Sequence, residues 1–253
     1  MKISEILVVL QRLAPEESAL EGDPIGMLVE CNAVEVSKVG VCLDATPAAV
    51  QRAAGIGAEL VIAHHPLIYH PLKRISTDPV STAVKTLVKN DIALYAMHTN
   101  WDLAPNGIND TLAECLELSD VNPLGTEGLS RLPRLGTLAC PRPLADFARF
   151  VEAALGCAET SALRVSTGDP RRMISRVAVC GGAGAELAEA VRIAGADAYV
   201  TSDVRHHEFW EAEARGLALV DAGHCATETP GMRALVRTLP GLLSGVEVVW
   251  IGD

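Results

Sequence analysis

The chain has 253 residues, of which 49% are hydrophobic and 21% are charged, a composition that excludes an intrinsically disordered protein. Its formal net charge of −11 disfavours general binding to nucleic-acid backbones. No apolar stretch reaches membrane-spanning length, the N-terminal residues do not resemble a signal peptide, and the seven cysteines are scattered. We therefore expect a cytoplasmic protein with reduced thiols and no membrane contact.

Helices and short apolar strands alternate along the chain. Hydrophobic spacing and capping residues predict helices over residues 2–13, 47–55, 79–90, 106–118, 144–155, 185–194, 206–215 and 227–238. Apolar runs predict strands over residues 39–43, 60–63, 92–97, 176–180, 198–201 and 217–222. This alternation predicts an α/β fold with mainly parallel, mixed sheets covered by helices.

The two halves of the chain resemble each other. A shift of 138 positions places His64 and His65 on Ser202 and Asp203, and a shift of 126 positions places 98–102 on 224–228. Any two β-α-β units with alanine-rich helices look alike, but packing alone does not require matching polar residues at strand ends. We therefore favour a duplication. Glycine and proline positions predict a first α/β repeat over 1–122, a linking region over 123–143 and a second α/β repeat over 144–253.

Histidines and acids follow three predicted strands directly, at the sheet edge where α/β proteins bind ligands. The groups are His64 with His65, His98 with Asp102, and His224 with Glu228. Imidazole and carboxylate ligands suit zinc, iron, manganese, cobalt or nickel, and the lack of a thiolate cluster argues against a structural zinc site. Five of these residues are the proposed ligands: His64, His65, Asp102, His224 and Glu228. Five ligands are too many for one catalytic tetrahedral ion, which favours a site with two divalent ions.

The spacing of these residues limits how they can bind. Neighbouring strand residues point to opposite faces, so His64 and His65 can serve one centre only at a strand end, as ligands to two different ions. The alternative is one buried and one exposed histidine. Residues four apart share a helical face, so each His-x-x-x-acid segment can bring both side chains to one centre. A helix cap or a surface ion pair is the alternative for a single copy.

Three other features have two interpretations each. Residues 180–184, Cys-Gly-Gly-Ala-Gly, form either a phosphate-binding loop or a tight strand-to-helix turn. We favour the turn, because the full dinucleotide pattern and the Walker lysine are absent. Asp203 and His206 follow another strand, and we interpret them as residues that support the ligands or contact substrate, with a capped helix start as the alternative. Trp210 is interpreted as a core or interface residue.

Together these segments resemble the GTP cyclohydrolase type 2 homologue family, also called the NGG-interacting factor three-like family. The matching segments occur in family order and cover nearly the whole chain: 43–46, 64–66, 97–102, 106–110, 180–184, 201–207 and 221–228. Two stretches depart from the family pattern. Residues 21–28 lack the usual Trp-Asp-Asn-x-Gly-Leu-Gln-like stretch, which puts a substrate role of that loop in doubt, and Ser202 stands where the family has glycine.

The resemblance implies two intertwined α/β repeats with a dinuclear metal site in the cleft between them, and a ring-shaped homohexamer. It also implies a distribution of ligands, with one ion on His65 and Asp102, the other on His64 and His224, and Glu228 as the bridge. His98 then lies near the metals without being a standard ligand, and it is a candidate catalytic acid or base.

These observations predict a metal-dependent hydrolase that acts on a small anionic substrate, either nucleotide-like, otherwise phosphorylated or cyclic. GTP ring opening is what the family name suggests. A metal-dependent regulatory or interaction protein without turnover is the main alternative. Metal storage or delivery is a third, which an enclosed cluster with a bridging carboxylate disfavours.

Overall fold

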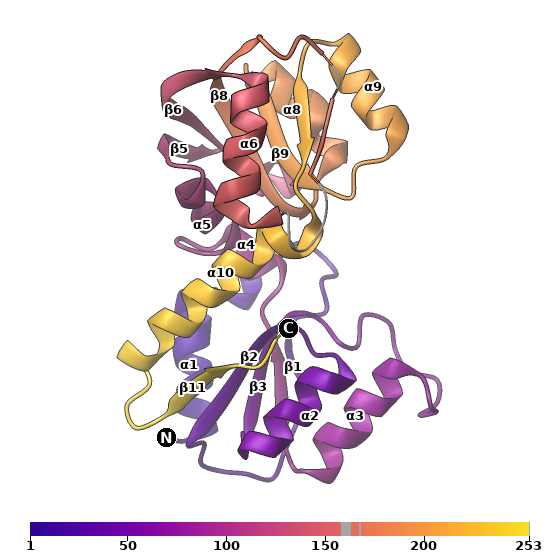
Figure 1. Cartoon of the computed structure of the whole chain (residues 1–253). Coiled ribbons are helices and arrows are strands. Elements are labelled where there is room, and N and C mark those ends of the chain that lie inside the picture. The colour runs from indigo at the N-terminus through magenta and orange to yellow at the C-terminus, as the bar shows by residue number, and fades with distance from the viewer. Residues whose placement is uncertain (158–162, 167, 253) are drawn as a thin grey trace. The chain divides into compact units, whose positions relative to one another are not determined.

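The computed structural model describes residues 1–157, 163–166 and 168–252, and the chain divides into two compact units. Unit 1 comprises Met1–Pro105 with Met232–Asp253, and unit 2 comprises Asn106–Gly231. Each unit is built on one β-sheet with helices packed against it (Figure 1). The predicted α/β fold with mixed, helix-covered sheets is thereby confirmed.

Unit 1 has a five-stranded sheet in the order β1-β4-β3-β2-β11. Its strands are β1 (Gly26–Val29), β2 (Lys38–Asp44), β3 (Leu60–His65), β4 (Ala93–Ala96) and β11 (Glu247–Trp250). Its helices are α1 (Ile3–Leu13), α2 (Pro47–Ile56), α3 (Pro79–Lys89), α4 (Thr99–Leu103) and the C-terminal part of α10 (His224–Thr238). Strand β1 runs antiparallel to β4, and the other three strand pairs are parallel.

The parallel arrangement of unit 1 follows from its sequence. Strand β3 is apolar up to its two histidines and its first five residues are buried, as a central parallel strand covered on both faces requires. Helix α2 begins where the Thr46 side chain accepts a hydrogen bond from the Ala49 N–H, and it ends at Gly57 in the left-handed conformation. Helices α2 and α3 pack side by side against one face of the sheet (Figure 1).

Unit 2 has a six-stranded sheet in the order β5-β6-β8-β9-β10-β7. Its strands are β5 (Leu118–Pro123), β6 (Arg134–Pro143), β7 (Arg164–Val165), β8 (Met173–Ala183), β9 (Ala198–Ser202) and β10 (Ala218–Asp221). Its helices are α5 (Ile108–Cys115), α6 (Leu144–Leu155), α8 (Ala188–Ile193), α9 (His206–Ala214) and the start of α10. Helices α5 and α6 bury Leu112 and Phe147 against apolar residues of β8 and β9.

Four strands of each unit share one arrangement. In unit 1, β2, β3 and β4 are parallel neighbours, and β1 lies antiparallel at the edge beside β4. In unit 2, β8, β9 and β10 are parallel neighbours, and β7 lies antiparallel at the edge beside β10. The matched strands are those that the two sequence shifts align, so the topology agrees with a duplication. The strand on the other side of β2 or β8 differs between the units, because β11 is parallel to β2 whereas β6 is antiparallel to β8.

The unit boundaries differ from the division that the sequence predicts. Residues 123–143 do not link two halves, because all of them belong to unit 2, where β5 and β6 pair as antiparallel neighbours. The chain instead passes between units after Pro105 and again within α10. Glycine and proline in this region mark the connection between β5 and β6, which contains a short 3₁₀ turn at Gly128–Arg131.

Two predicted helices differ from the observed ones in extent. The predicted helix over 106–118 is the shorter α5, which follows the separate five-residue helix α4. Helix α10 begins at His224, one turn before the predicted start at residue 227, so His224 lies on the helix itself. The difference matters for the site, because His224 and Glu228 then share one helical face.

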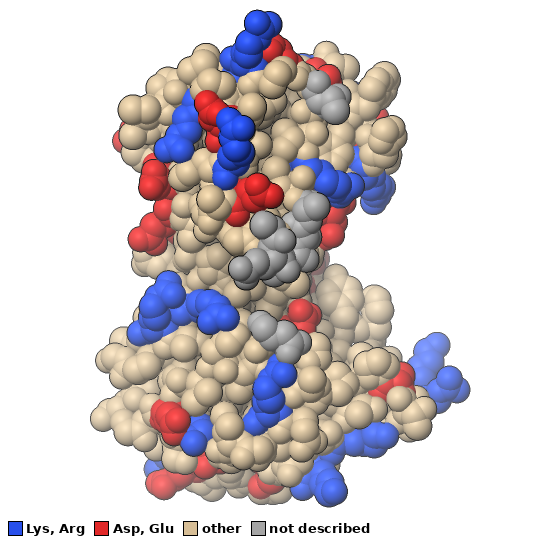
Figure 2. All heavy atoms as spheres, viewed as in Figure 1, with Lys and Arg blue, Asp and Glu red and all other residues tan. Residues whose placement is uncertain are grey.

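Among the described residues, no helix is both long enough and apolar enough to cross a membrane. Within each unit, basic and acidic side chains are interspersed on the face shown in Figure 2. The expectation that the chain has no general affinity for nucleic-acid backbones stays a prediction.

Candidate metal centre

Three histidine rings cluster in unit 1, where β3 and β4 end. The ring centre of His64 lies 4.9 Å from that of His65 and 5.1 Å from that of His98, and the His65 and His98 centres are 5.8 Å apart. One ring nitrogen from each of the three lies within 4.8 Å of the others. The strand end therefore brings both neighbouring histidines into one cluster, as the sequence argument requires.

Each of these rings is held through Nδ1 by an oxygen acceptor of the same unit. The three pairs each have an N···O distance of 2.8 Å: His64 with the Met97 carbonyl, His65 with Asp44 Oδ1, and His98 with Asp23 Oδ1. A carbonyl or a carboxylate can only accept, so Nδ1 carries the proton. The neutral ring then keeps its lone pair on Nε2, which is the form that binds a metal ion.

Asp102 supplies an acid to the same cluster. Its Oδ1 lies 3.6 Å from Nε2 of His64, and the two side chains are 10% and 0% exposed. Two ligand atoms that each lie about 2.1 Å from one ion are about 3.0–3.4 Å apart. The observed separation is slightly wider, so the two atoms are close enough to bind one ion or two neighbouring ions.

Asp23 is a site residue that the sequence analysis missed. Its Oδ1 accepts from His98, and its Oδ2 accepts from the Thr99 hydroxyl and, at 3.0 Å, from the Thr99 backbone N–H. Burial alone would raise the pKa of Asp23, but these hydrogen bonds outweigh it and lower the pKa below its ordinary value. Asp23 is therefore an ionised carboxylate at neutral pH. The available signal was an acid directly before Pro24, in the loop that departs from the family pattern.

Asp44 precedes α2 but does not cap it, because the cap of α2 is Thr46. Asp44 ends β2, which pairs in parallel with β3, and the register places it opposite His65. Its carboxylate therefore orients the His65 ring from the neighbouring strand.

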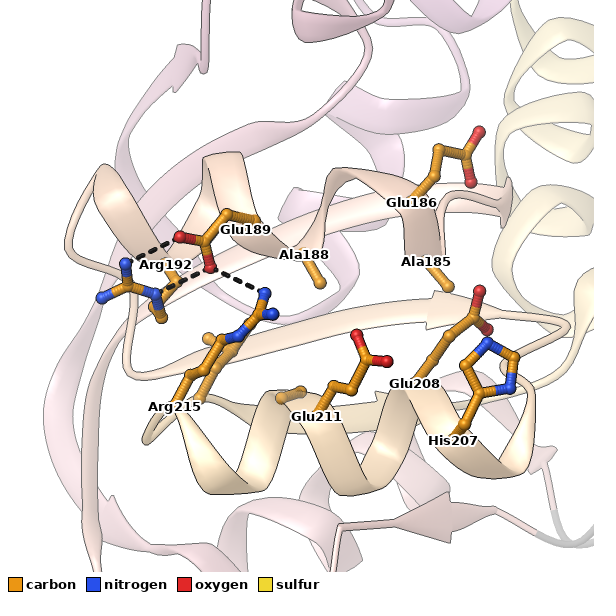
Figure 3. Close-up of a pocket in the computed structure, with 11 residues that line it drawn as sticks. Ala185, Glu186, Ala188, Glu189, Arg192, His207, Glu208, Glu211 and Arg215 are labelled. Carbon is orange, nitrogen blue, oxygen red and sulfur yellow. Dashed lines mark hydrogen bonds and ion pairs between the residues drawn. The ribbon is translucent and has the colours of Figure 1, made fainter.

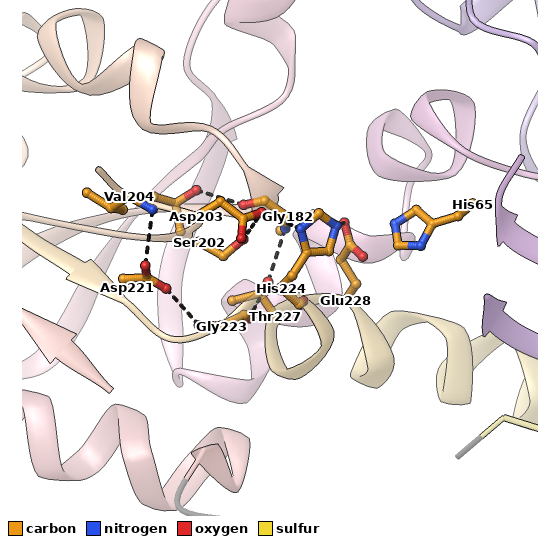
Figure 4. A network of polar contacts seen from close by, with 12 residues as sticks. His65, Gly182, Ser202, Asp203, Val204, Asp221, Gly223, His224, Thr227 and Glu228 are labelled. Carbon is orange, nitrogen blue, oxygen red and sulfur yellow. Dashed lines mark hydrogen bonds and ion pairs between the residues drawn. The ribbon is translucent and has the colours of Figure 1, made fainter. Parts of the chain in front are cut away.

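In unit 2, His224 and Glu228 lie one turn apart on α10 (Figure 4). His224 Nε2 is 3.2 Å from Glu228 Oε1, within the separation expected for two ligands of one ion. The Nδ1 atom of His224 is 2.5 Å from Asp203 Oδ2, so this ring is also held through Nδ1 by a carboxylate. Glu228 is only 3% exposed, whereas Asp203 lies at the surface.

The loop that carries Asp203 is braced by a second acid (Figure 4). Asp221 Oδ2 accepts from the Val204 N–H at 3.1 Å and pairs with Arg164, and Asp221 Oδ1 accepts from the Gly223 N–H at 3.0 Å. Asp203 has a φ of 55°, a left-handed conformation that non-glycine residues rarely adopt. Asp221 therefore fixes the two loops that present Asp203 and His224 to each other.

Glycines 181 and 182 make room for Glu228. A Cβ atom on Gly182 would lie 2.3 Å from Glu228 Oε1 and 3.3 Å from His224 Nε2. Their backbone N–H groups donate to side chains, that of Gly181 to Asn109 at 2.7 Å and that of Gly182 to Thr227 at 3.0 Å. The segment therefore lies against the acid of α10, and its N–H groups are not arranged as a phosphate-binding loop, in agreement with the favoured interpretation.

Two of the residues singled out by sequence lie apart from these contacts. His206 is exposed on the first turn of α9, and its role stays a prediction. Trp210, on the same helix, is 67% exposed, so its interpretation as a core residue is wrong. Its interpretation as an interface residue stays a prediction. Cys225 is exposed beside His224, and we assign it no part in metal binding.

A separate hollow of about 180 Å³ lies between α8 and α9 in unit 2 (Figure 3). Its most prominent contact is Glu189, which pairs with Arg192 at 2.8 Å and with Arg215 at 3.3 Å. The hydrogen bonds from Arg192 lower the pKa of Glu189 to about 2. We interpret this hollow as a surface feature formed around an ion-pair network between two helices. None of the ligands predicted from the sequence lines it.

The fold and the sequence have close counterparts among known proteins. The family model of Duf34/NIF3 (NGG1p interacting factor 3) matches residues 1–252. The "GTP cyclohydrolase 1 type 2 homolog" of Streptomyces coelicolor is 41% identical over 242 residues, which cover 90% of this chain and 82% of the relative.

Solved structures show the same fold. Reduced HcgD from Methanocaldococcus jannaschii has a TM-score of 0.85 and 29% identity, and the match covers 99% of this chain and 98% of that one. A Bacillus cereus protein related to NIF3 has a TM-score of 0.90 at 24% identity, covering 98% of this chain and 96% of that one.

The close approach of Gly182 to Glu228 leads to a test within unit 2. We expect Gly182→Ala to displace the Glu228 carboxylate, because the added methyl group overlaps it, and to weaken metal binding about 10- to 100-fold. Metal titration followed by calorimetry measures the change. Gly216→Ala is the control, because Gly216 also has a positive φ but nothing lies within 4 Å of its Cβ position. Equal metal affinity in both variants would contradict the packing argument.

Proposed function

The chain belongs to the Duf34/NIF3 family, and we propose that it binds two divalent metal ions and uses them to hydrolyse a nucleotide-like or phosphorylated substrate. The proposed ligands are His64, His65 and Asp102 from unit 1, and His224 and Glu228 from unit 2. The relatives are named as homologues of a GTP cyclohydrolase, and that name suggests the class of reaction to test first.

One observation carries the proposal most directly. All three proposed histidine ligands, and His98 as well, hold Nδ1 against an acceptor and so keep Nε2 for a metal. Acceptors that orient imidazole in this way are typical of metal ligands and raise their basicity. Imidazole and carboxylate donors fit zinc, iron, manganese, cobalt and nickel, so the residues present suit a divalent ion.

The surroundings of the acids support hydrolytic chemistry. When bound, such ions polarise a substrate oxygen and supply a nucleophile from water near neutral pH. Glu228 and Asp102 are buried, and electrostatic interactions are stronger there than in water. An anionic substrate oxygen is therefore favoured beside the ions, despite the negative net charge of the chain.

His98 is suited to move a proton. Its Nδ1–H donates to Asp23, which fixes the tautomer and leaves Nε2 as a base. Part of the ring is exposed to solvent, with 23% of the side chain accessible, so water or a substrate group can reach it.

Replacing the proposed bridging acid tests metal binding and catalysis together. We expect Glu228→Gln to lower the metal content from two ions per chain and to reduce kcat at least 100-fold, because the amide cannot replace an anionic ligand. Elemental analysis of the purified protein measures the metals. Turnover is measured on a panel of nucleotides, including GTP, and phosphoesters.

Glu211→Gln is the matched control, since Glu211 is an exposed acid of unit 2 outside the proposed ligand set. If Glu228→Gln retained two ions, Glu228 would not be a bridging ligand. A wild-type protein with two ions and no turnover on the panel would rule out hydrolysis of the substrates tested.

The Asp23–His98 pair leads to a separate prediction. In Asp23→Asn, the amide can no longer accept from both His98 and Thr99, so the His98 ring loses its fixed orientation. We expect kcat to fall about 10- to 100-fold while the metal content stays at the wild-type value. Loss of metal in Asp23→Asn would show instead that His98 acts as a ligand.

Exposure of Trp210 favours a second candidate function, that of a metal-dependent interaction protein. Trp210 is 67% exposed, and large aromatic side chains are enriched at protein interfaces. An interaction protein of this kind would bind its partner through Trp210 and turn over no substrate. A metal-dependent interaction requires that partner binding is lost both in Trp210→Ala and with the metal loss of His64→Ala. Partner binding that survives the metal loss of His64→Ala would show that the interaction does not depend on the metal.

A further inference from the structure

A pocket of about 250 Å³ lies beside His65 in unit 1. Its walls include three proline rings and two aliphatic side chains: Pro47, Pro66, Pro79, Leu67 and Val80. The polar part of the lining is formed by His65, the Asp44 carboxylate that orients it, and Thr46. The pocket is therefore mostly apolar and is continuous with one proposed metal ligand.

The pocket occupies the place where α/β sheets bind ligands. It adjoins the carboxyl ends of the parallel strands β2 and β3, and the first residues of α2 and α3 form two of its sides. A helix start at such a position often binds phosphate through free backbone N–H groups.

At this pocket, most backbone N–H groups at the starts of α2 and α3 are absent or already donate a hydrogen bond. Pro47 and Pro79 occupy the first turns of α2 and α3 and have no N–H. The N–H groups of Ala49 and Ser81 donate to the helix caps, Thr46 at 3.1 Å and Asp78 at 2.9 Å. The carboxylate of Asp44 adds negative charge. These features disfavour a phosphate and favour an uncharged group.

We propose that this pocket holds an uncharged ring of the substrate whose polar group is bound at the metal centre beside His65. The assignment rests on the proposed function. Complete small-molecule sites have volumes of about 300–1,000 Å³, so a pocket of about 250 Å³ suits one ring system and not a whole nucleotide. The proline walls are rigid, so the pocket is formed before the ring enters.

Two probes with the same anionic head group distinguish binding in the pocket from binding at the metals. Methylphosphonate and phenylphosphonate are titrated by calorimetry into protein saturated with Zn²⁺, at a pH where both are dianions. The ring advantage is the Kd of methylphosphonate divided by that of phenylphosphonate. We expect a ring advantage of about tenfold, or ~1.4 kcal/mol, for the wild-type protein.

Val80→Glu is the test variant, because it places a carboxylate in the apolar wall at the start of α3, where an acid suits the helix. Val88→Glu is the control, since Val88 lies on the same helix, is 64% exposed and does not line the pocket. We expect the ring advantage to fall to about one in Val80→Glu and to stay near tenfold in Val88→Glu.

Other outcomes overturn the assignment in distinguishable ways. If both probes bind equally well to the wild-type protein, the pocket holds no ring, and the proposed metal centre stands. If the ring advantage survives in Val80→Glu, the ring binds elsewhere. If neither probe binds to the zinc-loaded protein, the proposed anion-binding metal centre fails, and the ring pocket fails with it.

Discussion

Each proposed histidine ligand depends on a hydrogen bond between its Nδ1–H and an oxygen acceptor of its own unit. This contact decides which nitrogen carries the proton, and so which nitrogen can bind a metal. It also limits rotation of the ring, so the position of Nε2 is set by the backbone that carries the acceptor. The acceptors lie at strand ends or in the loops beside them, and the α/β fold is what brings them to the rings.

The two units meet this requirement with different residues at matching positions. In unit 1, His65 ends β3 and His98 follows β4, and their rings are neighbours. In unit 2, the matching positions hold Asp203 and His224, which form a hydrogen bond. Unit 1 thus has His65 at the position where unit 2 has Asp203, the acid that orients His224. A duplicated fold can diverge in this way, because the strand ends stay fixed while their side chains change.

The sequence predicted the parts of this arrangement that depend on local pattern. The apolar runs of β2, β3 and β4 and the histidines and acids at strand ends are all visible in short windows of residues. The edge strands β1, β5, β7 and β11 were missed, because short edge strands have neither a long apolar run nor clear alternation. The internal strand β6 was also missed, because its glycine and prolines suggest a linking region. Asp23 was also missed, since its contact with His98 spans 75 positions and leaves no periodic signal.

We expect divalent ions to bind through the Nε2 atoms that these hydrogen bonds leave unprotonated. Anomalous X-ray diffraction from crystals of the metal-loaded protein tests this expectation most directly. We expect two anomalous peaks per chain, about 2.0–2.1 Å from Nε2 of His64, His65 and His224, with Asp102 and Glu228 oxygens as further ligands. Peaks at Nδ1 atoms, or peaks remote from these five residues, would contradict it.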